Sequence, residues 1–302
     1  MKTISKLTLI KVFFVIFVAS CGNNKKNYDA SGNFEATEII VSSQANGQIM
    51  KFNINEGQTV EANKSIGYVD TIQLHLKKIQ FQANLKAIDS RFYDVSKQIA
   101  ATNQQIVKQK TELQRFENLV QSNAATQKQV DDISAQIILL QKQLAAQTET
   151  LENNNRSISG ESAALAAQIR QIEDLISKSI IYSPINGTVL SKYAEQGEVT
   201  AQGKALFKVA DTNNMFLRAY ITSDQIAQMK LGQEVKVFVD AGNKNMKEYS
   251  GTITWISDKA EFTPKTIQTR NERANQVYAV KIAVKNDAFL KIGMYGELKV
   301  EN

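Results

Sequence analysis

The feature that most constrains this chain is a stretch from residue 71 to about 179 with no proline and a single glycine, Gly160. Within it, apolar residues recur at alternating four- and three-residue spacing. The first run comprises Phe81, Leu85, Ile88, Phe92, Val95, Ile99, Ile106, Leu113, Phe116 and Val120. The second comprises Val130, Ile133, Ile137, Leu140, Leu144, Leu151, Ile158, Leu165, Ile172 and Leu175. Sustained heptads of this kind predict a coiled coil.

The two runs are joined by the short segment QSNAAT, residues 121–126. A connection of this length forces the helices into an antiparallel hairpin. Each arm, about fifty residues long, would reach about 75 Å at about 1.5 Å per residue, much further than a domain core requires. The length of the arms therefore predicts an elongated molecule.

The predicted seam of the second arm is polar at every other position, namely at Gln147, Asn154, Glu161 and Gln168. Polar seam residues weaken packing, but they specify register or leave room for a partner. Two explanations stay open: a partly wet two-stranded seam, or a flank that packs against neighbouring hairpins in an oligomer.

A repeated phrase flanks the helical stretch. The chain reads NGQIMKFNINEGQTV from residue 46 and NGTVLSKYAEQGEVT from residue 186. Val, Ile and aromatic residues between glycine-containing turns predict short strands. We interpret the two phrases as halves of one pseudo-symmetric β domain that the hairpin splits. The matched glycines are predicted to occupy turns with positive φ; they are Gly47, Gly57, Gly187 and Gly197.

The end of the chain, residues 212–302, is again mainly β in pattern. Alternating apolar residues define several strands, and TSDQIAQMKLG adds one short helix. Antiparallel strands with a single short helix predict a small β-barrel.

The N-terminus predicts export. Lys2 and Lys6 precede a short apolar run that ends in VASCG, and Cys21 is the only cysteine of the chain. The run is too short for a spanning helix and suits a signal peptide over residues 1–20. The VASC sequence resembles the bacterial lipobox, which implies a lipid on Cys21 and a stable membrane anchor.

The composition gives no sign of catalysis or nucleic-acid binding. The net charge is +6, without a basic block interleaved with aromatic residues, so no nucleic-acid partner is expected. The single histidine, His75, and a lipidated cysteine cannot build a zinc site. No phosphate-binding glycine motif occurs, so any ATP hydrolysis belongs to a partner. We expect no cofactor and no enzymatic activity.

As a whole, the layout resembles the HlyD-like membrane fusion proteins, which are periplasmic adaptor subunits of bacterial exporters. The phrases SPINGTVLSKYAEQGEVTAQGKALFKVAD, DQIAQMKLGQEVKVFVD and LKIGMYGELKV carry this resemblance over nearly all of the mature chain. It implies a mixed α and β, elongated fold: a split lipoyl-like (barrel-sandwich hybrid) domain, an inserted coiled-coil hairpin and an antiparallel β-barrel. The expected segments are 1–20 signal peptide, 21–35 lipidated tether, 36–70 first lipoyl-like half, 71–180 hairpin, 181–211 second half and 212–302 barrel.

The hairpin tip carries a further resemblance. Adaptors that engage TolC-like outer-membrane channels carry Arg, Leu and Ser around the turn, at spacings that Arg115, Leu119 and Thr126 reproduce here. Thr in place of Ser keeps a hydroxyl. An Arg on a solvated face, a Leu beside the seam and an N-cap Thr would read the same way structurally.

The family resemblance implies the partners and the compartment. We expect a lipoprotein of the inner membrane that reaches into the periplasm of a two-membrane bacterium and forms a homo-oligomer, commonly a hexameric ring. Its partners would be an inner-membrane transporter and a TolC-like channel. The phrase EFTPKTIQTRNERANQVYAVKI favours an ABC-type exporter over an RND pump.

Two other functions fit parts of the sequence. One is a structural lipoprotein that spaces two membranes without transport. The other is a biotinyl or lipoyl carrier, which presents a modifiable lysine at a hairpin tip. Here the insert replaces that tip, and Lys51 lacks the carrier's flanking pattern.

Overall fold

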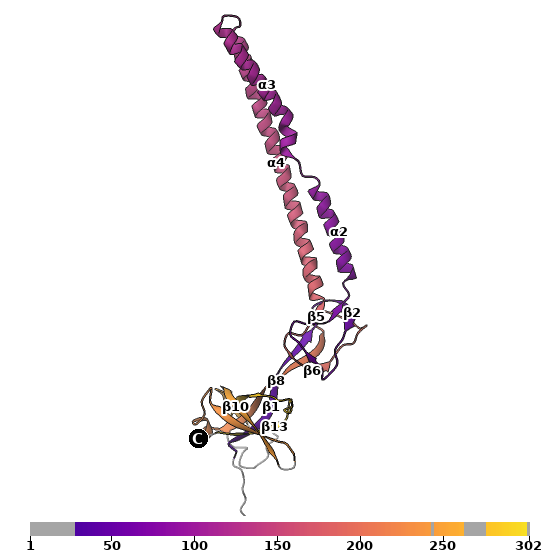
Figure 1. The fold of residues 1–302 in the computed structure, drawn as a ribbon, viewed down its shortest axis with the longest axis vertical. Coiled ribbons are helices and arrows are strands. Elements are labelled where there is room, and N and C mark those ends of the chain that lie inside the picture. Colours follow the sequence, from indigo (N-terminus) through magenta and orange to yellow (C-terminus); the bar gives the residue numbers. More distant parts are fainter. Residues whose placement is uncertain (1–27, 243–244, 263–275, 301–302) are drawn as a thin grey trace, which may run out of the picture.

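The computed structural model describes residues 28–242, 245–262 and 276–300. The molecule is elongated, with a β-barrel at one end, a smaller β domain next to it and a long helical hairpin beyond (Figure 1). The predicted fold class, mixed α and β with a hairpin inserted in a split β domain, is therefore confirmed. The predicted signal peptide and Cys21 lie outside the described residues.

The elements follow in the order β, helical hairpin, β. Before the hairpin come β1 (Ala30–Ser42), β2 (Gly47–Phe52), β3 (Thr59–Val60) and β4 (Ser65–Val69). The hairpin consists of α2 (Ile72–Asp89), α3 (Val95–Gln121) and α4 (Gln127–Lys178). After it come β5 (Ile180–Tyr182), β6 (Gly187–Lys192), β7 (Val199–Thr200), β8 (Ala205–Thr222), α5 (Ser223–Ile226), β9 (Glu234–Asp240), β10 (Met246–Ile256), β11 (Glu261–Phe262), β12 (Gln276–Lys285) and β13 (Tyr295–Lys299).

Strands β1 and β8 connect the two β domains. They pair antiparallel over nearly their whole length, and the register shifts between Ala36 and Thr37, where β8 bulges. At this bulge the Thr212 hydroxyl lies 2.9 Å from that of Thr188, and its carbonyl accepts from Asn286 Nδ2 at 2.7 Å. The bulge is thus hydrogen-bonded to β6 on one side and to the barrel on the other.

The expected tether over residues 21–35 is wrong for its last part. Residues 30–33 already pair with β13, and Phe34 is fully buried in the barrel core. A polar composition hid this strand, because only its inward side chains need to be apolar. The first barrel strand therefore precedes the lipoyl-like domain in the chain.

The lipoyl-like domain consists of β2 to β7 with the upper parts of β1 and β8, and its two halves interlock. Gly47 of the first half pairs with Thr200 of the second, and Val60 pairs with Gly187 in the equivalent place. The loop hydrogen bonds repeat the exchange: Gly57 N donates to Val189 O, and Gly197 N donates to Ile49 O, both at 2.8 Å. Neither half can complete its sheets alone.

The core of this domain draws on both halves. Its buried members include Ile49, Phe52, Ile54, Val60, Val69, Ile181, Val189, Leu206, Phe207 and Val209. Burial of each such side chain is worth about 1.5–3 kcal/mol relative to exposure. The repeated phrase supplies the inward-facing residues on both sides of the pseudo-symmetry.

Three of the four predicted turn glycines have positive φ: Gly47 at 146°, Gly57 at 81° and Gly197 at 92°. The prediction is wrong for Gly187, which does not belong to the positive-φ residues. A Cβ on Gly187 would lie 2.2 Å from the carbonyl oxygen of Ala210. This glycine is needed because β6 approaches β8 closely, and its backbone dihedral is ordinary.

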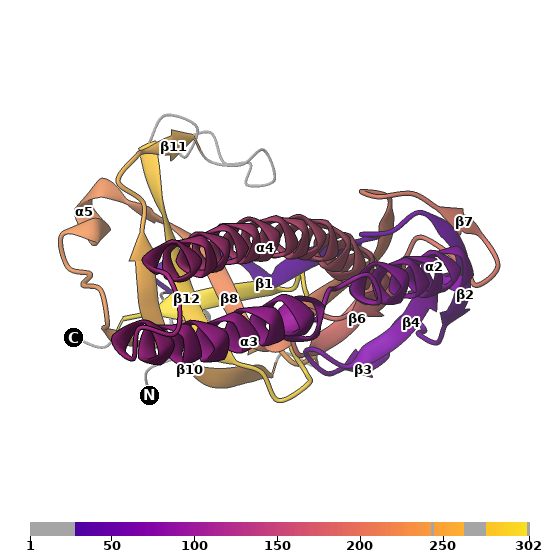
Figure 2. The ribbon, with the colours of Figure 1, turned by 90° about the horizontal axis from the view of Figure 1, so that it is seen from above.

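The first arm of the hairpin is broken, whereas two uninterrupted arms were expected. Helix α2 ends at Asp89, α3 begins at Val95, and α4 runs unbroken opposite both (Figure 1). Seen from above, α3 and α2 follow one another along the same helix α4 (Figure 2). The residues between them include Phe92, which was predicted to lie in the seam and is instead exposed.

The break is satisfied by polar groups. Asp94 caps α3, where its side chain accepts from Lys97 N at 3.2 Å. The side chain of Asn155 on α4 accepts from Tyr93 N at 2.9 Å and donates to Tyr93 O at 2.8 Å, so it replaces the helical partners of that peptide. The sequence analysis missed Asn155; its signal is the polar run ENNN opposite FYD.

The seam of α4 also shifts by one residue below the break. Gln147 lies in the predicted seam, where it contacts Thr102 at 3.2 Å. Beyond Ile158, however, the buried or half-buried positions are Asn155, Ser162, Ile169, Ile172 and Ile176, and the predicted Asn154, Glu161, Gln168 and Leu175 are exposed. A straight α-helix drifts from a strict seven-residue repeat by about 20° per heptad. The broken arm lets α4 follow this drift.

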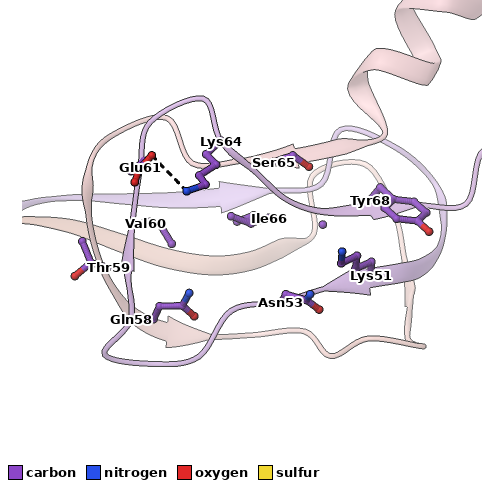
Figure 3. A pocket seen from close by; sticks show the side chains of 11 residues that line it. Lys51, Asn53, Gln58, Thr59, Val60, Glu61, Lys64, Ser65, Ile66 and Tyr68 are labelled. Atoms are coloured by element: carbon purple, nitrogen blue, oxygen red, sulfur yellow. Dashed lines mark hydrogen bonds and ion pairs between the residues drawn. The ribbon is translucent and has the colours of Figure 1, made fainter.

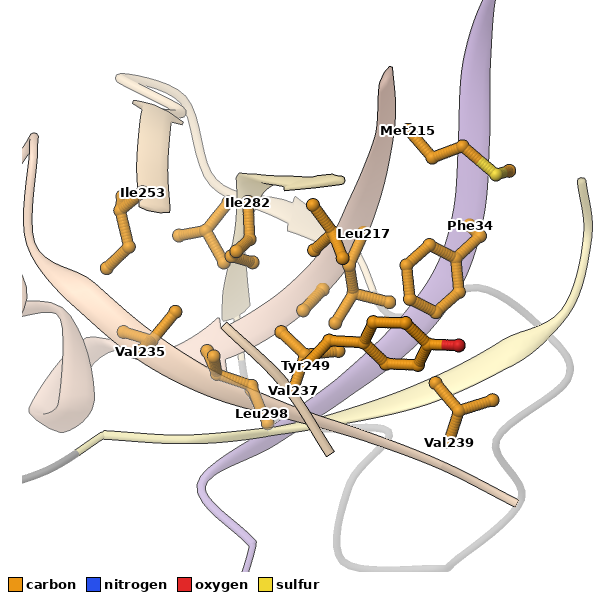
Figure 4. Packing of buried hydrophobic residues seen from close by; sticks show 14 of the residues in the cluster. Phe34, Met215, Leu217, Val235, Val237, Val239, Tyr249, Ile253, Ile282 and Leu298 are labelled. Atoms are coloured by element: carbon orange, nitrogen blue, oxygen red, sulfur yellow. The ribbon is translucent and has the colours of Figure 1, made fainter. Parts of the chain in front are cut away.

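The barrel has the other large core. The core includes Phe34, Met215, Leu217, Val235, Val237, Tyr249, Ile253, Ile282 and Leu298, which point toward one another from five strands (Figure 4). Strand β8 pairs with β12 along the barrel part and with β1 on its other edge. The barrel is thereby continuous with the lipoyl-like domain through two strands.

Candidate functional site at the hairpin tip

The turn at the end of the hairpin is compact and hydrogen-bonded. Ala124 N donates to Leu119 O at 2.8 Å, and the Ser122 hydroxyl donates to the same carbonyl at 2.9 Å. Asn123 has a φ of 59°, in the left-handed region that Asn tolerates better than most residues. The chain therefore reverses within a few exposed residues at the far end of the molecule (Figure 1).

Thr126 begins α4 as its N-cap. Both its backbone N–H and its hydroxyl donate to Gln129 Oε1, at 2.9 and 3.0 Å. The hydroxyl proton is thus engaged within the chain, while the oxygen keeps lone pairs that can accept a hydrogen bond from a partner.

Arg115 and Leu119 lie one turn apart on the last turns of α3. The Arg115 side chain is 70% exposed and lies 3.5 Å from Glu112. An exposed pair of this kind adds little stability, so the guanidinium can turn to another acceptor. Leu119 is half-buried beside the turn. The fold brings the three predicted tip residues to the same end of the hairpin.

A polar hollow of about 310 Å³ lies in the lipoyl-like domain, between β2, β3 and β4 (Figure 3). Lys51, Asn53, Lys64 and Tyr68 are among its lining residues. Lys51 lies inside β2 opposite Tyr68, and Lys64 pairs with Glu61 at 3.5 Å. A carrier lysine stands at the tip of a hairpin, and Lys51 does not occupy such a position.

A second hollow of about 410 Å³ lies where α4 meets the lipoyl-like domain. Ile40 of β1, Tyr182 of β5 and Lys178 of α4 are among its lining residues. Ile40 is more than half exposed. This hollow marks the junction between the hairpin and the domain that carries it.

The barrel holds one charged cluster that perturbs a pKa strongly. Asp287 accepts from Lys247 Nζ and from the Tyr249 hydroxyl, the latter at 2.9 Å. The hydrogen bond from Lys247, ahead of that from Tyr249, lowers the pKa of Asp287 to about 2. The Lys247 ammonium also lies 4.8 Å from the centre of the Phe289 ring. The cluster joins β10 to the loop after β12.

Metal and membrane signals were searched across the described residues. Among them, no group of three or more His, Cys, Asp or Glu side chains is arranged to hold a metal ion. His75 is exposed on α2. Within the same parts of the chain, no helix has both the length and the apolar composition needed to cross a membrane.

Comparison with known families gives a match over more than half of the chain. A family model described as RND MFP, barrel-sandwich hybrid domain, covers residues 37–212. A UPF0194 membrane protein of Yersinia pseudotuberculosis serotype O:3 is 25% identical over 284 residues, covering 87% of this chain and 86% of that protein. UPF0194 membrane protein YbhG of Salmonella gallinarum is 25% identical over 289 residues, covering 87% and 85%.

Solved structures share the fold. MacA from Actinobacillus actinomycetemcomitans has a TM-score of 0.52 and 21% identity, covering 89% of this chain and 76% of its own. A MacA–MexA chimera with the Pseudomonas aeruginosa MexA α-hairpin has a TM-score of 0.52 and 24% identity, covering 90% and 81%. The membrane fusion protein Spr0693 from Streptococcus pneumoniae R6 has a TM-score of 0.50 and 18% identity, covering 90% and 97%.

Proposed function

The chain belongs to the membrane fusion protein family whose barrel-sandwich hybrid domain it carries, and from that premise we propose that it links an inner-membrane transporter to a TolC-like outer-membrane channel. Its role is that of a non-enzymatic adaptor for the export of small molecules or toxins. The transporter is proposed to be an ABC-type exporter, on the sequence resemblance of residues 261–282.

The observation that carries the proposal is the linear order of the domains. The barrel, the lipoyl-like domain and the hairpin follow one another along the long axis, and the chain reverses at the far end (Figure 1). Two such ends, one beside each membrane, are what a connecting subunit needs. A spacer lipoprotein would need the length but not a specific tip.

The anchor sets the direction. Ala30 begins β1 in the barrel and pairs with Leu298, so a lipid on Cys21 would be attached a few residues before the barrel. A lipidated Cys21 in the inner membrane would therefore keep the barrel near that membrane. The hairpin would then point through the periplasm toward the outer membrane.

The tip is proposed as the contact with the channel. Arg115 supplies a mobile cation, Leu119 an apolar side chain, and Thr126 a hydroxyl oxygen that can accept a hydrogen bond. Copies of the chain in a ring, expected to be a hexamer, would present several such tips to one channel.

The experiment that tests the proposal is a cross-link from the tip. Asn123→Cys, combined with the native chain, places an exposed thiol in the turn. A bifunctional thiol-to-amine reagent in whole cells should capture an outer-membrane channel, which mass spectrometry identifies. Gln104→Cys on α3, exposed but turns away from the tip, is the matched control and should not capture the channel. Failure of Asn123→Cys to capture it in cells that produce the protein well would contradict the proposal.

A further inference from the structure

Helix α2 is apolar on two opposite sides. One side packs on α4 through half-buried Phe81, Leu85 and Ile88. The opposite side carries Ile72, Leu76 and Ile79, whose exposures are 58%, 55% and 61%. Ala83 and Ala87 continue this exposed row, and the five residues are called here the outer stripe of α2. A helix that is apolar on both sides indicates a second packing partner, because exposed aliphatic rows mark interaction sites.

Helix α4 carries an uncovered face next to the same part of the hairpin. This face is uncharged and made of mostly small residues, all exposed: Gly160, Ala164, Ala167, Gln171 and Leu175, called here the outer stripe of α4. A Cβ on Gly160 would meet nothing within 4 Å, so the fold of one chain gives no reason for a glycine there. Leu175 is 41% exposed.

The two stripes lie at the same level along the hairpin. Lys78 pairs with Glu173 at 2.8 Å, and the Ser162 hydroxyl donates to Asp89. These contacts place Leu76 level with Leu175. In the same alignment, Ile79 is level with Gln171, and Ala83 and Ala87 are level with Ala167 and Ala164.

We propose that the outer stripe of α2 in one copy packs against the outer stripe of α4 in the next copy. The copies are related by rotation about an axis parallel to the hairpin. Such a rotation moves no residue along the axis, so residues at one level in one copy meet residues at the same level in the next. Leu76 then meets Leu175, and the alanines above them allow the helices to approach closely. The inference rests on the proposed function, which requires copies side by side.

Charge favours α4 over a second α2 as the occupant. Helix α2 carries Lys77, Lys78 and Lys86 against Asp89 alone. A face-to-face pair of α2 helices would gather the lysines of both copies, which is unfavourable. The facing part of α4 offers Glu161, Glu173 and Asp174 against two cations, and Asp174 lies near the level of Lys77.

Contact area favours a closed ring over a dimer. A helix of this length is about 27 Å long and about 10 Å wide, so one stripe covers about 270 Å². A stable interface buries about 800 Å² on each partner. A single helix contact is too small to hold two copies. A ring uses both stripes of every copy, closes on itself and adds contacts between the β domains.

The test uses paired cysteines in the full chain, produced in its native cells. Leu76→Cys combined with Leu175→Cys places two thiols where adjacent copies should meet. Mild oxidation should give a ladder of dimers, trimers and larger species, because each copy has one thiol for each neighbour. Either substitution alone should give no ladder, since the same residue of two copies does not meet.

Each other outcome overturns the inference. Dimers formed by Leu76→Cys alone would show that α2 packs on α2. No species beyond the monomer from the double variant would show that the stripes do not meet. The Asn123→Cys capture, run in parallel, separates the two proposals: a captured channel without a ladder removes this interface and leaves the adaptor function standing.

A second variant guards against a cysteine pair that is geometrically unsuitable for a disulfide. Leu76→Asp should reduce the amount of assembled species by at least tenfold in amine-to-amine cross-linking. Val107→Asp on α3 is the matched control, because Val107 is 54% exposed and lies outside both stripes. Full assembly by Leu76→Asp, or equal loss in both variants, would contradict the proposed contact.

Discussion

The lipoyl-like domain and the hairpin inserted in it are held together in opposite ways. The domain buries side chains from both halves of the chain almost completely, and its sheets pair across the pseudo-symmetry. The hairpin has a thin seam in which α2 has no fully buried residue and α3 has only Ile106. Where packing is dense, one atom is decisive. Where it is thin, the backbone can break and polar groups such as Asn155 can replace helical hydrogen bonds.

The largest expected effect is in the lipoyl-like domain, at Gly187. Gly187→Val should destabilise the protein by about 4 kcal/mol or more, because a Cβ would lie 2.2 Å from Ala210 O. Gly57→Ala is the comparison: its φ is 81° but nothing lies within 4 Å, so about 1–2 kcal/mol is expected. Urea unfolding measures both. Equal costs would show that the close strand approach is not what requires glycine at 187.

Core truncation should sharpen the contrast. Phe207→Ala should cost about 3–5 kcal/mol, since Phe207 is fully buried between the halves. Ile106→Ala should cost about 2 kcal/mol, because one face of α3 is open to solvent and the site can collapse. Denaturant midpoints of the two variants give the comparison. A larger loss for Ile106→Ala would mean that the seam is more densely packed than its burial indicates.

The break tests whether polar groups hold the thin region together. Asn155→Ala removes both hydrogen bonds to the Tyr93 peptide and should weaken the junction of α2 and α3 by about 1–2 kcal/mol. Hydrogen exchange of residues 90–95 should accelerate. The neighbouring Asn154→Ala, at an exposed position, is the control and should leave exchange unchanged. Similar exchange in the two variants would remove Asn155 from this role.

Acid should separate the barrel from both other regions. The pKa of Asp287 is lowered to about 2, so its stabilising contribution is present above the ordinary value of 3.8 and is lost as pH falls from about 4 to about 2. Asp287→Asn should lack this pH-dependent part, and its difference from the native protein should shrink over that range. Trp255, the single tryptophan, lies in β10 and reports barrel unfolding by fluorescence. Parallel pH profiles for the two proteins would contradict the assignment.

The smallest effect on stability is expected at the tip. Leu119→Asp and Thr126→Asp should change the free energy of unfolding by about 0.5 kcal/mol or less, because the tip lies outside any core. Both should nevertheless abolish export in a deletion strain, while Leu119→Met should retain it. Normal export by stably produced Asp variants would remove the tip from the mechanism.

Much of the architecture is legible in the sequence because it depends on repetition. The phrase at 46 and its copy at 186 predict the two halves, and the heptads predict the hairpin. The break is harder to predict, because Phe92 fits the apolar register while Asp94 caps a new helix. The seam shift beyond Ile158 follows from that break. Gly187 was assigned the right importance for the wrong reason, since strand proximity leaves no local signal.

The docking surfaces show the same limit. Arg115, Leu119 and Thr126 could be named only through a family resemblance, and their placement at one end does not test what they bind. The outer stripe of α2 was readable in principle: Ile72, Leu76 and Ile79 form a second helical row beside the seam row. It becomes informative only once α4 is seen to cover the opposite side.

The interlocked halves determine the order in which the chain can fold. The first half emerges without its pairing partners, since Val60 must wait for Gly187. The hairpin depends on local contacts, and such contacts form early. Once it has zipped, Val69 N and Ser179 O lie 2.9 Å apart, so the second half starts beside the first whatever the number of residues between them. The entropy of closing that loop depends on the hairpin's two ends and not on its reach. Matched residues can thus be added to or removed from both arms during evolution, fitting the molecule to a wider or narrower gap without changing how its β domain assembles.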